Sequence, residues 1–411
     1  MAHQAGARRR VRAPRALALF CVLTAVPLAF ADGDGGGNGG AFSFSNEVEG
    51  SLVRAIVSLR ENGLKAAIGE IDSALERTPN FKLGHMIRGD LLMARAGKPI
   101  AFGNTEAASA AGVSNLQQEA RVRLQRYLDS SPPVDFLPAP VLQLAASQQH
   151  VILVDTGRSR LYVFQNHGGT PTYVTDFYIS LGKNGVDKTR EGDQKTPIGV
   201  YTIVSSKGKL PDFYGTVAFP ISYPNDWDKR HGRNGHGIWL HGTPSDTYSR
   251  PPFATDGCVV LTNDDLARLS RFVDVGRTPV VIGPAVEWKD PRDWQAQRDD
   301  FLGAFEQWRA DWESMDTNKY FAHYGSDFRS EGGKDRAAWI AYKRKVSTGK
   351  AWVKVGVSQV SLFAYPGAGP MMMVTFDQDY RSNNLSNRTK KRQYWMREGN
   401  RWRIVQETVI S

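Results

Sequence analysis

The spacing of apolar residues changes twice along the 411-residue chain, and each change predicts a different kind of structure. From about residue 46 to 130 apolar residues recur every three or four positions, as at Ile68 and Ile71, which indicates amphipathic helices. At Gln149 the pattern becomes alternating and rich in β-branched residues, which is typical of strands. After Trp288 an aromatic-rich helical stretch precedes three strand-like runs. We therefore expect a multidomain protein with an α-helical part, a mostly-β part and an α+β part.

The predicted organisation has six segments, whose bounds follow composition as well as periodicity. Gly-rich and Pro-rich stretches separate the folded parts, since such compositions favour linkers. The segments are a signal peptide over 1–31, a Gly-rich linker over 32–45, a helical module over 46–130, a Pro-rich linker over 131–148, a mostly-β domain over 149–284 and an α+β domain over 295–411.

The helical module resembles a single tetratricopeptide-like hairpin over residues 65–92, which includes Gly84 and Gly89. One such unit cannot bury its apolar face alone. We therefore expect it to pack on its neighbours and to be able to contact envelope proteins. A plain structural helical extension is the alternative.

The first 31 residues have the order of a secretory signal peptide. Five arginines without an acid precede an apolar run over 16–31 that ends in Ala29-Phe30-Ala31. The run contains Pro27 and is shorter than the ~20 residues that a bilayer span requires. We expect cleavage after Ala31, export to the periplasm and no stable membrane span afterwards, with an uncleaved anchor as the alternative. Removing the five arginines lowers the formal net charge from +10 to +5, and nucleic acid is not an expected partner of an exported protein.

The mature chain is expected to contain a single cysteine. The sequence has only Cys21 and Cys258, and Cys21 leaves with the signal peptide. A lone thiol in an oxidising compartment cannot form an internal disulfide, so it is either buried and inert or kept for its reactivity. The cysteine count alone leaves both alternatives open.

The densest group of candidate functional residues surrounds this cysteine. An apolar strand ends in His241, which lies 17 positions before Cys258. A histidine within hydrogen-bond reach can take the thiol proton and stabilise the thiolate, so we expect Cys258 to be a nucleophile and His241 its general base and acid. No acid follows the histidine, so a backbone carbonyl near Gly242 is expected to orient the imidazole. Gly257 allows a close backbone approach, and amide groups at this turn are candidates for holding an oxyanion.

With these residues the chain resembles the YkuD-type L,D-transpeptidase family. The family signature is a histidine followed by Gly or Ser and, about 15 to 18 positions on, by Ser or Thr, any residue, Gly and Cys. Here His241-Gly242 and Thr255-Asp256-Gly257-Cys258 fill both halves of the signature. A second family-like element is Lys195-Thr196-Pro197-Ile198-Gly199-Val200-Tyr201. The resemblance covers the mostly-β domain and implies a YkuD-type catalytic fold there.

The chain also resembles the branch of this family in which a nuclear-transport-factor-like domain follows the catalytic domain. The residues that carry this likeness are Tyr223-Pro224-Asn225, Asp228, Arg230, Gly232-Arg233, Ser249-Arg250-Pro251-Pro252 and Asp256-Gly257-Cys258. The branch includes cell-shape enzymes that act as L,D-carboxypeptidases. The resemblance implies a cone-like sheet in the C-terminal α+β domain.

The resemblance implies a thioester mechanism on peptidoglycan stem peptides, without a cofactor. Cys258 attacks the carbonyl of the diamino acid and expels D-alanine, and His241 protonates the leaving amine. An amine acceptor then completes L,D-transpeptidation, whereas water completes L,D-carboxypeptidation to a tripeptide. A catalytically idle wall-binding scaffold with a buried Cys258 is a third alternative.

Candidate substrate-binding residues follow from their place around the two motifs. They are Tyr223, Asn225, Trp239, Arg250, Thr255 and Asp256. The family often has Arg two positions after the cysteine, where this chain has Val260, so Arg250 is our candidate for binding the substrate carboxylate. For Asn225 and Asp228, a role as turn former is as good an interpretation as substrate binding. For Trp239, a place in the core is more common than stacking on a ligand.

Three histidines at intervals of five residues, His231, His236 and His241, raise the alternative of a zinc site completed by Cys258. Offsets of five place side chains on opposite faces of a strand and make them diverge on a helix, so we expect no metal. The glycines between the histidines leave the alternative open, because they allow irregular loops.

Overall fold

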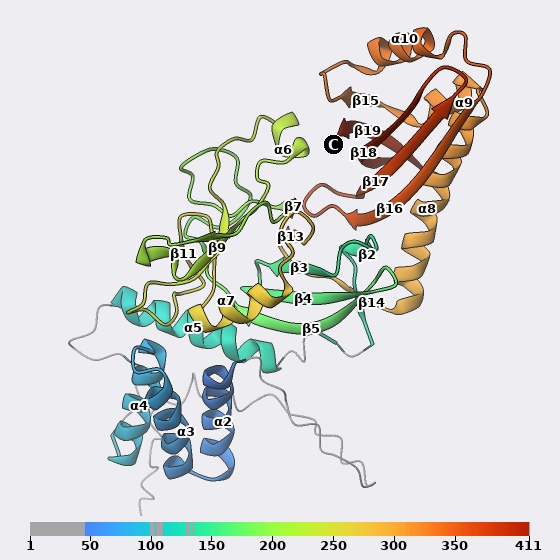
Figure 1. Cartoon of the computed structure of the whole chain (residues 1–411). Coiled ribbons are helices and arrows are strands. Elements are labelled where there is room, and N and C mark those ends of the chain that lie inside the picture. The colour runs from blue at the N-terminus through green and yellow to red at the C-terminus, as the bar shows by residue number, and fades with distance from the viewer. Residues whose placement is uncertain (1–45, 99–102, 104–109, 129–131, 134, 411) are drawn as a thin grey trace, which may run out of the picture. The chain divides into compact units, whose positions relative to one another are not determined.

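The structure is a computed structural model that describes residues 46–98, 103, 110–128, 132–133 and 135–410 (Figure 1). The predicted signal peptide and Gly-rich linker therefore lie outside the described residues. The chain divides into an N-terminal unit, residues 1–117, and a C-terminal unit, residues 118–411, which are described separately. Among the described helices, none is both long enough and apolar enough to cross a membrane.

The N-terminal unit is helical, as predicted. It contains α2 (Glu47–Glu61), α3 (Leu64–Arg77), α4 (Lys82–Arg95) and the first turns of α5 (Ala110–Leu128). Asn46 caps α2 by accepting from the backbone N–H groups of Val48 and Glu49. The small and aliphatic side chains of the predicted helical period are buried, among them Leu52 and Ile71. The tetratricopeptide-like character of this unit stays a prediction.

The central domain of the C-terminal unit is built on two sheets. The larger one has the strand order β5-β4-β3-β13-β7 and the smaller one β12-β10-β9-β8. The larger sheet is made of β3 (His150–Asp155), β4 (Arg160–His167), β5 (Thr170–Tyr178), β7 (Gly199–Thr202) and β13 (Pro279–Gly283). The smaller sheet is made of β8 (Lys207–Gly208), β9 (Val217–Pro220), β10 (Trp239–His241) and β12 (Val259–Val260).

Short elements complete this domain around the two sheets. They are a parallel pair of β6 (Leu181–Gly182) and β11 (Phe253–Thr255), the helices α6 (Asp226–Arg230) and α7 (Asn263–Leu269), and the 3₁₀ turns η2 (Asp212–Tyr214) and η3 (Ser270–Phe272). Thr262 caps α7 by accepting from the Asp265 N–H.

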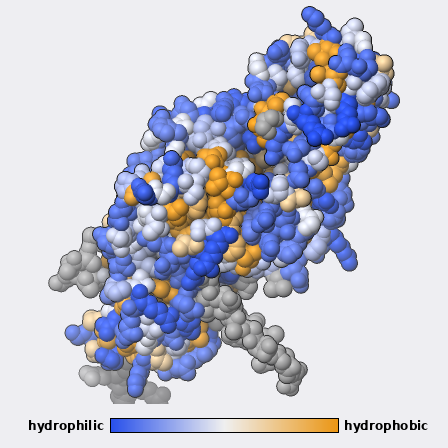
Figure 2. Space-filling model, viewed as in Figure 1, coloured by the Kyte–Doolittle hydropathy of each residue, from blue (hydrophilic) through white to orange (hydrophobic). Residues whose placement is uncertain are grey.

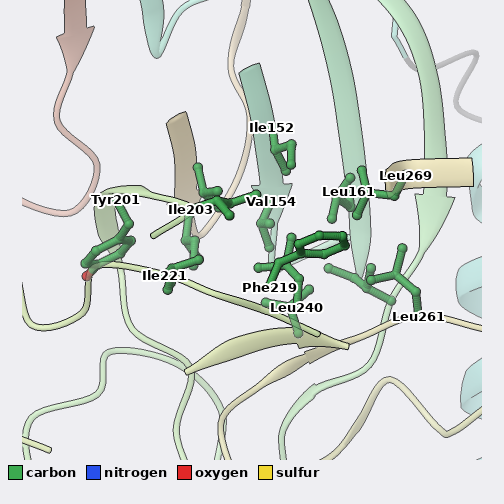
Figure 3. Close-up of a cluster of buried hydrophobic side chains, with 14 of the residues drawn as sticks. Ile152, Val154, Leu161, Tyr201, Ile203, Phe219, Ile221, Leu240, Leu261 and Leu269 are labelled. Carbon is green, nitrogen blue, oxygen red and sulfur yellow. The ribbon is translucent and has the colours of Figure 1, made fainter. Parts of the chain in front are cut away.

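One apolar core joins the two sheets of the central domain (Figure 3). Ile152 and Leu161 come from the larger sheet, Phe219 and Leu240 from the smaller one, and Leu269 from α7. All five side chains are almost fully excluded from water. Because both sheets contribute to this core, the strand that carries His241 is fixed against the β3–β4 hairpin.

The C-terminal domain is an α+β structure, as predicted, with the strand order β15-β19-β18-β17-β16-β2. Its elements are β2 (Val141–Gln143), α8 (Pro291–Glu313), α9 (Thr317–Ala322), β15 (Tyr324–Ser330), α10 (Arg336–Ser347), β16 (Val353–Ala364), β17 (Met371–Ser382), β18 (Ser386–Glu398) and β19 (Arg401–Val409). Aromatic side chains of α8, including Phe301, Phe305 and Trp308, pack with Trp395 of β18 in its core. In Figure 1 α8 runs along this sheet.

The segment 131–148 is more than the linker that its prolines predicted. It contains β1 (Leu137–Pro138), which pairs with β14 (Trp288–Lys289), and β2, which pairs with β16 of the C-terminal sheet. Val141 and Leu142 of β2 are fully buried and enter two different cores. A strand of three residues is too short to show a period, which is why the sequence pattern did not reveal it.

The surface of the molecule is mostly hydrophilic in the view of Figure 2. Hydrophobic side chains gather on this face in the region where Figure 1 draws β7 and β13. The apolar periodicity of the sequence corresponds mainly to buried positions, many of them in the hydrophobic cores of the C-terminal unit.

Candidate functional site

Strands β10 and β12 bring His241 and Cys258 to the same face of one sheet. The two strands are parallel, with Leu240 paired to Val259 and His241 paired to Val260. Cys258 directly precedes β12. If the same register is extended by one residue, Cys258 lies opposite Trp239, which is two positions before His241 on β10. Residues at even offsets on neighbouring parallel strands point to the same side of the sheet. In this arrangement the Cys258 thiol donates to the Gly237 carbonyl at 3.4 Å.

The imidazole of His241 is held by the carbonyl of the next residue. Nδ1 lies 2.8 Å from the Gly242 oxygen, and the carbonyl can only accept, so Nδ1 carries the proton. Nε2 is therefore the nitrogen that can take a proton in the neutral ring. Burial lowers the pKa of His241 to about 4; the hydrogen bond to Gly242 opposes this shift and the charge of Arg250 adds to it. His241 is thus a neutral base at neutral pH.

Asn263, a residue that the sequence analysis missed, fixes the backbone after His241. Its Oδ1 accepts from the Thr243 N–H at 3.2 Å, and its Nδ2 donates to the Thr243 carbonyl at 3.0 Å. A Cβ on Gly242 would collide with this amide oxygen, which explains the glycine. The signal for Asn263 was its place in the first turn of the capped helix α7. It supports the carbonyl that orients the imidazole.

The turn before Cys258 depends on a glycine and two threonines. Gly257 has a φ of +122°, and a Cβ there would lie 2.7 Å from the Lys195 carbonyl oxygen. Thr255 Oγ1 accepts from the Gly257 N–H at 3.1 Å and donates to the Cys258 carbonyl at 2.8 Å. Thr196 Oγ1 donates to the Gly257 carbonyl at 3.0 Å. The two sequence motifs therefore meet in this turn, and the hydroxyl of Thr255 shapes it rather than facing a ligand.

The Cys258 thiol is mostly protonated in the structure as it stands. The residue is half-buried, and burial raises the pKa of the thiol to about 11. A backbone hydrogen bond from Trp239 and the charges of Arg250 and Lys188 lower this pKa, whereas Asp256 raises it. The resting pair is thus a thiol beside a neutral imidazole.

An aromatic wall, which we define as Phe213, Tyr214 and Trp239, stands beside the candidate base. The ring centroid of Tyr214 lies 5.1 Å from that of His241 and 5.0 Å from that of Trp239. Phe213 lies 6.1 Å from His241 and is 49% exposed. The Arg250 guanidinium lies 4.7 Å from the Phe213 ring centroid. Phe213 and Tyr214 were not among the predicted site residues, although an aromatic pair within a polar stretch could have indicated a ligand-facing position.

The other predicted substrate-binding residues are placed differently. Tyr223 is buried, and its hydroxyl donates to the Asn234 carbonyl at 3.0 Å. Asn225 is buried as the N-cap of α6, and its amide donates to the Val200 carbonyl and to the hydroxyl of Tyr365 in the C-terminal domain. Asp256 is exposed and forms an ion pair with Lys183 at 3.0 Å. These contacts favour the turn-former alternative for Asn225 and leave Trp239 and Arg250 beside the site.

The three histidines of the zinc alternative have separate surroundings. His231 packs on Trp227 with ring centroids 4.4 Å apart, and its Nδ1 lies 2.9 Å from the Trp227 carbonyl oxygen. His236 is exposed beside Glu191, whereas His241 is buried. Within the described ranges, no three His, Cys, Asp or Glu side chains form a group that could hold a metal ion.

Comparison with known families gives two matches, one for each large domain. Residues 149–282 match the YkuD model, described as the L,D-transpeptidase catalytic domain. Residues 300–408 match the model described as the Cds6 C-terminal NTF2-like domain.

One curated relative and two solved structures are informative. "Putative L,D-transpeptidase YafK" of Escherichia coli strain K12 is 31% identical over 128 residues, which are 26% of this chain and 48% of YafK, so the chain spans about half the length of the curated relatives it matches. Bd1075 of Bdellovibrio bacteriovorus is 30% identical with a TM-score of 0.59, and the match covers 67% of this chain and 98% of Bd1075. The helical cell shape determining protein Pgp2 from Campylobacter jejuni is 26% identical with a TM-score of 0.55, covering 65% of this chain and 95% of Pgp2.

The thiol pKa predicts an unusual pH dependence of alkylation. Only the thiolate reacts, so the rate at which iodoacetamide modifies Cys258 should still rise above about pH 9 in the folded protein. In the urea-denatured chain the same rate should level off near the ordinary thiol pKa of about 8.5. Mass spectrometry of the modified protein over a pH series measures both. A plateau below about pH 8 in the folded protein would contradict a thiol whose pKa is raised by burial.

The role of Asn225 predicts a loss of stability. Asn225→Ala removes the α6 cap and two hydrogen bonds of the amide, so we expect the free energy of unfolding to fall by about 2 kcal/mol. The exposed Asn387 serves as a control, and Asn387→Ala should change this free energy by less than about 0.5 kcal/mol. Urea-induced unfolding followed by tryptophan fluorescence measures both. Equal free energies of unfolding for the two variants would contradict the structural role of Asn225 and favour a role in ligand binding.

Proposed function

Because the chain belongs to the proteins that join a YkuD-type L,D-transpeptidase domain to a C-terminal NTF2-like domain, we propose that it is an exported periplasmic acyltransferase of peptidoglycan stem peptides. The single observation that carries this proposal is the parallel pairing of β10 and β12, with Cys258 and His241 on one face. The bond that reacts joins the diamino acid to the terminal D-alanine. No cofactor takes part.

The proposed reaction proceeds in two steps through a thioester. As the Cys258 sulfur forms a bond to the diamino acid carbonyl, the thiol proton passes to Nε2 of His241. The carbon–nitrogen bond then breaks, and His241 returns the proton to the amine of D-alanine. An acceptor amine next attacks the thioester and loses a proton to His241, and the released sulfur takes that proton back.

The hydrogen bond between His241 Nδ1 and the Gly242 carbonyl supports this order of events. It fixes the tautomer with Nε2 open for the proton, and it stabilises the imidazolium while that form exists. In this proposal the oxyanion develops beside the turn at Gly257, directly before the sulfur, where the Gly257 N–H itself donates to Thr255 Oγ1.

Hydrolysis of the thioester is the second candidate reaction. One of the similar structures, Pgp2, is named a helical cell shape determining protein, and we propose trimming of tetrapeptides to tripeptides as the corresponding chemistry here. The two outcomes differ only in the second nucleophile, an amine or water.

We also propose that the helical unit, which we interpret as tetratricopeptide-like, contacts envelope proteins.

The central experiment uses pure disaccharide tetrapeptides and mass analysis of the products. Crosslinked dimers identify transpeptidation, and tripeptides alone identify carboxypeptidation. Cys258→Ala should abolish both products, and His241→Gln should lower the rate at least about 100-fold because it removes the base. His236→Gln changes an exposed histidine and is the matched control. Undiminished turnover in Cys258→Ala would exclude the thioester, and a wild-type protein that yields neither product would favour the wall-binding scaffold.

Arg250 predicts a change in substrate affinity. Its guanidinium lies beside the aromatic wall and acts electrostatically on Cys258, which suits it to bind the carboxylate of the acyl donor. Arg250→Gln should raise KM for the tetrapeptide about tenfold while kcat falls much less. The exposed Arg277 provides the control variant Arg277→Gln, which should leave both constants unchanged. An unaltered KM in Arg250→Gln would remove the arginine from the binding site.

A further inference from the structure

The second half of α5 carries a buried ion pair outside residues 149–282, the range that matches the catalytic family. Glu119 and Arg123 stand one helical turn apart, with Arg123 Nε 2.9 Å from Glu119 Oε1. Their side chains are 2% and 1% exposed, respectively. Both residues belong to the C-terminal unit. Two charges removed from water to this degree require compensating contacts, and these contacts lead to the candidate site.

Glu119 contacts the segment 243–252, which connects β10 to β11, and Arg123 contacts a residue that bonds to this segment. Glu119 Oε1 accepts a hydrogen bond from Ser249 Oγ at 2.7 Å. The Arg123 guanidinium lies 4.0 Å from the ring centroid of Tyr178, and the Tyr178 hydroxyl donates to the carbonyl of Arg250 at 2.8 Å. The ion pair thus supports the backbone immediately before Arg250 and at Arg250 itself.

The segment has no helix or strand of its own, so such contacts decide where Arg250 lies. Ser180 Oγ, from the end of the same strand region as Tyr178, donates to the Pro251 carbonyl at 2.5 Å. Three consecutive residues of the segment are therefore anchored. The Arg250 side chain is left to extend over Phe213 and to act on the Cys258 sulfur.

We propose that Glu119, Arg123 and Tyr178 are positioning residues that hold the segment 243–252 so that Arg250 stays beside Cys258. The part of this inference that concerns binding of the acyl-donor carboxylate by Arg250 rests on the proposed function. The placement of Arg250 relative to the sulfur does not depend on it. A helix that precedes the catalytic domain in the chain is thus part of the support of its site.

The test uses three variants of the full chain. Tyr178→Phe removes one hydroxyl and keeps the ring under Arg123, so the fold is least disturbed. Glu119→Gln weakens the anchor of Ser249. Arg126→Gln is the matched control, because Arg126 lies on the same helix but pairs with Asp176 of β5, away from the segment 243–252.

The first measurement needs no substrate. The pH profile of Cys258 alkylation reports the charges around the sulfur, which are the cations Arg250 and Lys188 and the anion Asp256. A cation that moves away destabilises the thiolate, so Tyr178→Phe and Glu119→Gln should shift the profile upward by about half a pH unit, in the direction of Arg250→Gln. Arg126→Gln should superpose on the wild type. Profiles of Tyr178→Phe and wild type that superpose, or an equal shift in Arg126→Gln, would overturn the proposal.

The second measurement is the KM for the tetrapeptide. Tyr178→Phe and Glu119→Gln should raise it several-fold with kcat within about twofold, whereas Arg126→Gln should not. A shifted alkylation profile with an unchanged KM would refute the link to the carboxylate. If the wild-type protein does not turn over the tetrapeptide, the proposed function fails, while the alkylation profiles still decide whether these residues place Arg250.

Discussion

Strand β10 is paired on both edges, antiparallel to β9 and parallel to β12. A parallel neighbour cannot be reached by a tight turn, so the chain needs a long connection between His241 and the strand after Cys258. That connection is the stretch that contains the segment 243–252, β11 and the Gly257 turn. The spacing of the two candidate catalytic residues and the place of Arg250 on an irregular connection both follow from this one pairing.

The electrostatics of the pair follow from burial rather than from mutual charge. Removal of water raises the pKa of the thiol to about 11 and lowers that of the imidazole to about 4. This gap is too wide for a thiolate–imidazolium pair to be the main resting form. In the proposed mechanism, the proton therefore moves as the sulfur attacks, and the role of the protein is to hold Nε2 and the sulfur on one face for that moment. A neutral resting pair also protects the Cys258 thiol from oxidation, since the thiolate is the reactive form.

The sequence predicted those parts of the protein that rest on local pattern. The helical period of α3, the alternating pattern of β3 and the motif residues His241 and Cys258 are all readable over a few neighbouring positions. The three-residue strand β2 was missed because it has no period, and its partner β16 lies more than 200 residues away. The buried contacts of Asn225 and the aromatic neighbours of His241 were also missed. These contacts join residues that are distant in the sequence and meet only in the folded chain.

Support for the candidate site comes from both sides of the catalytic domain in the chain. On one side, Glu119 of α5 contacts the segment that carries Arg250, and Arg123 packs on Tyr178, whose hydroxyl donates to the Arg250 carbonyl. On the other side, α6 contacts the C-terminal domain, because Asp226 accepts from Arg392 and Thr408 and Trp227 stacks on Tyr394 with centroids 5.5 Å apart. Arg250 lies on an irregular connection, and such a connection depends on side-chain contacts to hold its place. The contact of Glu119 with Ser249 acts at this connection, whereas the contacts of α6 join the catalytic domain to the C-terminal domain.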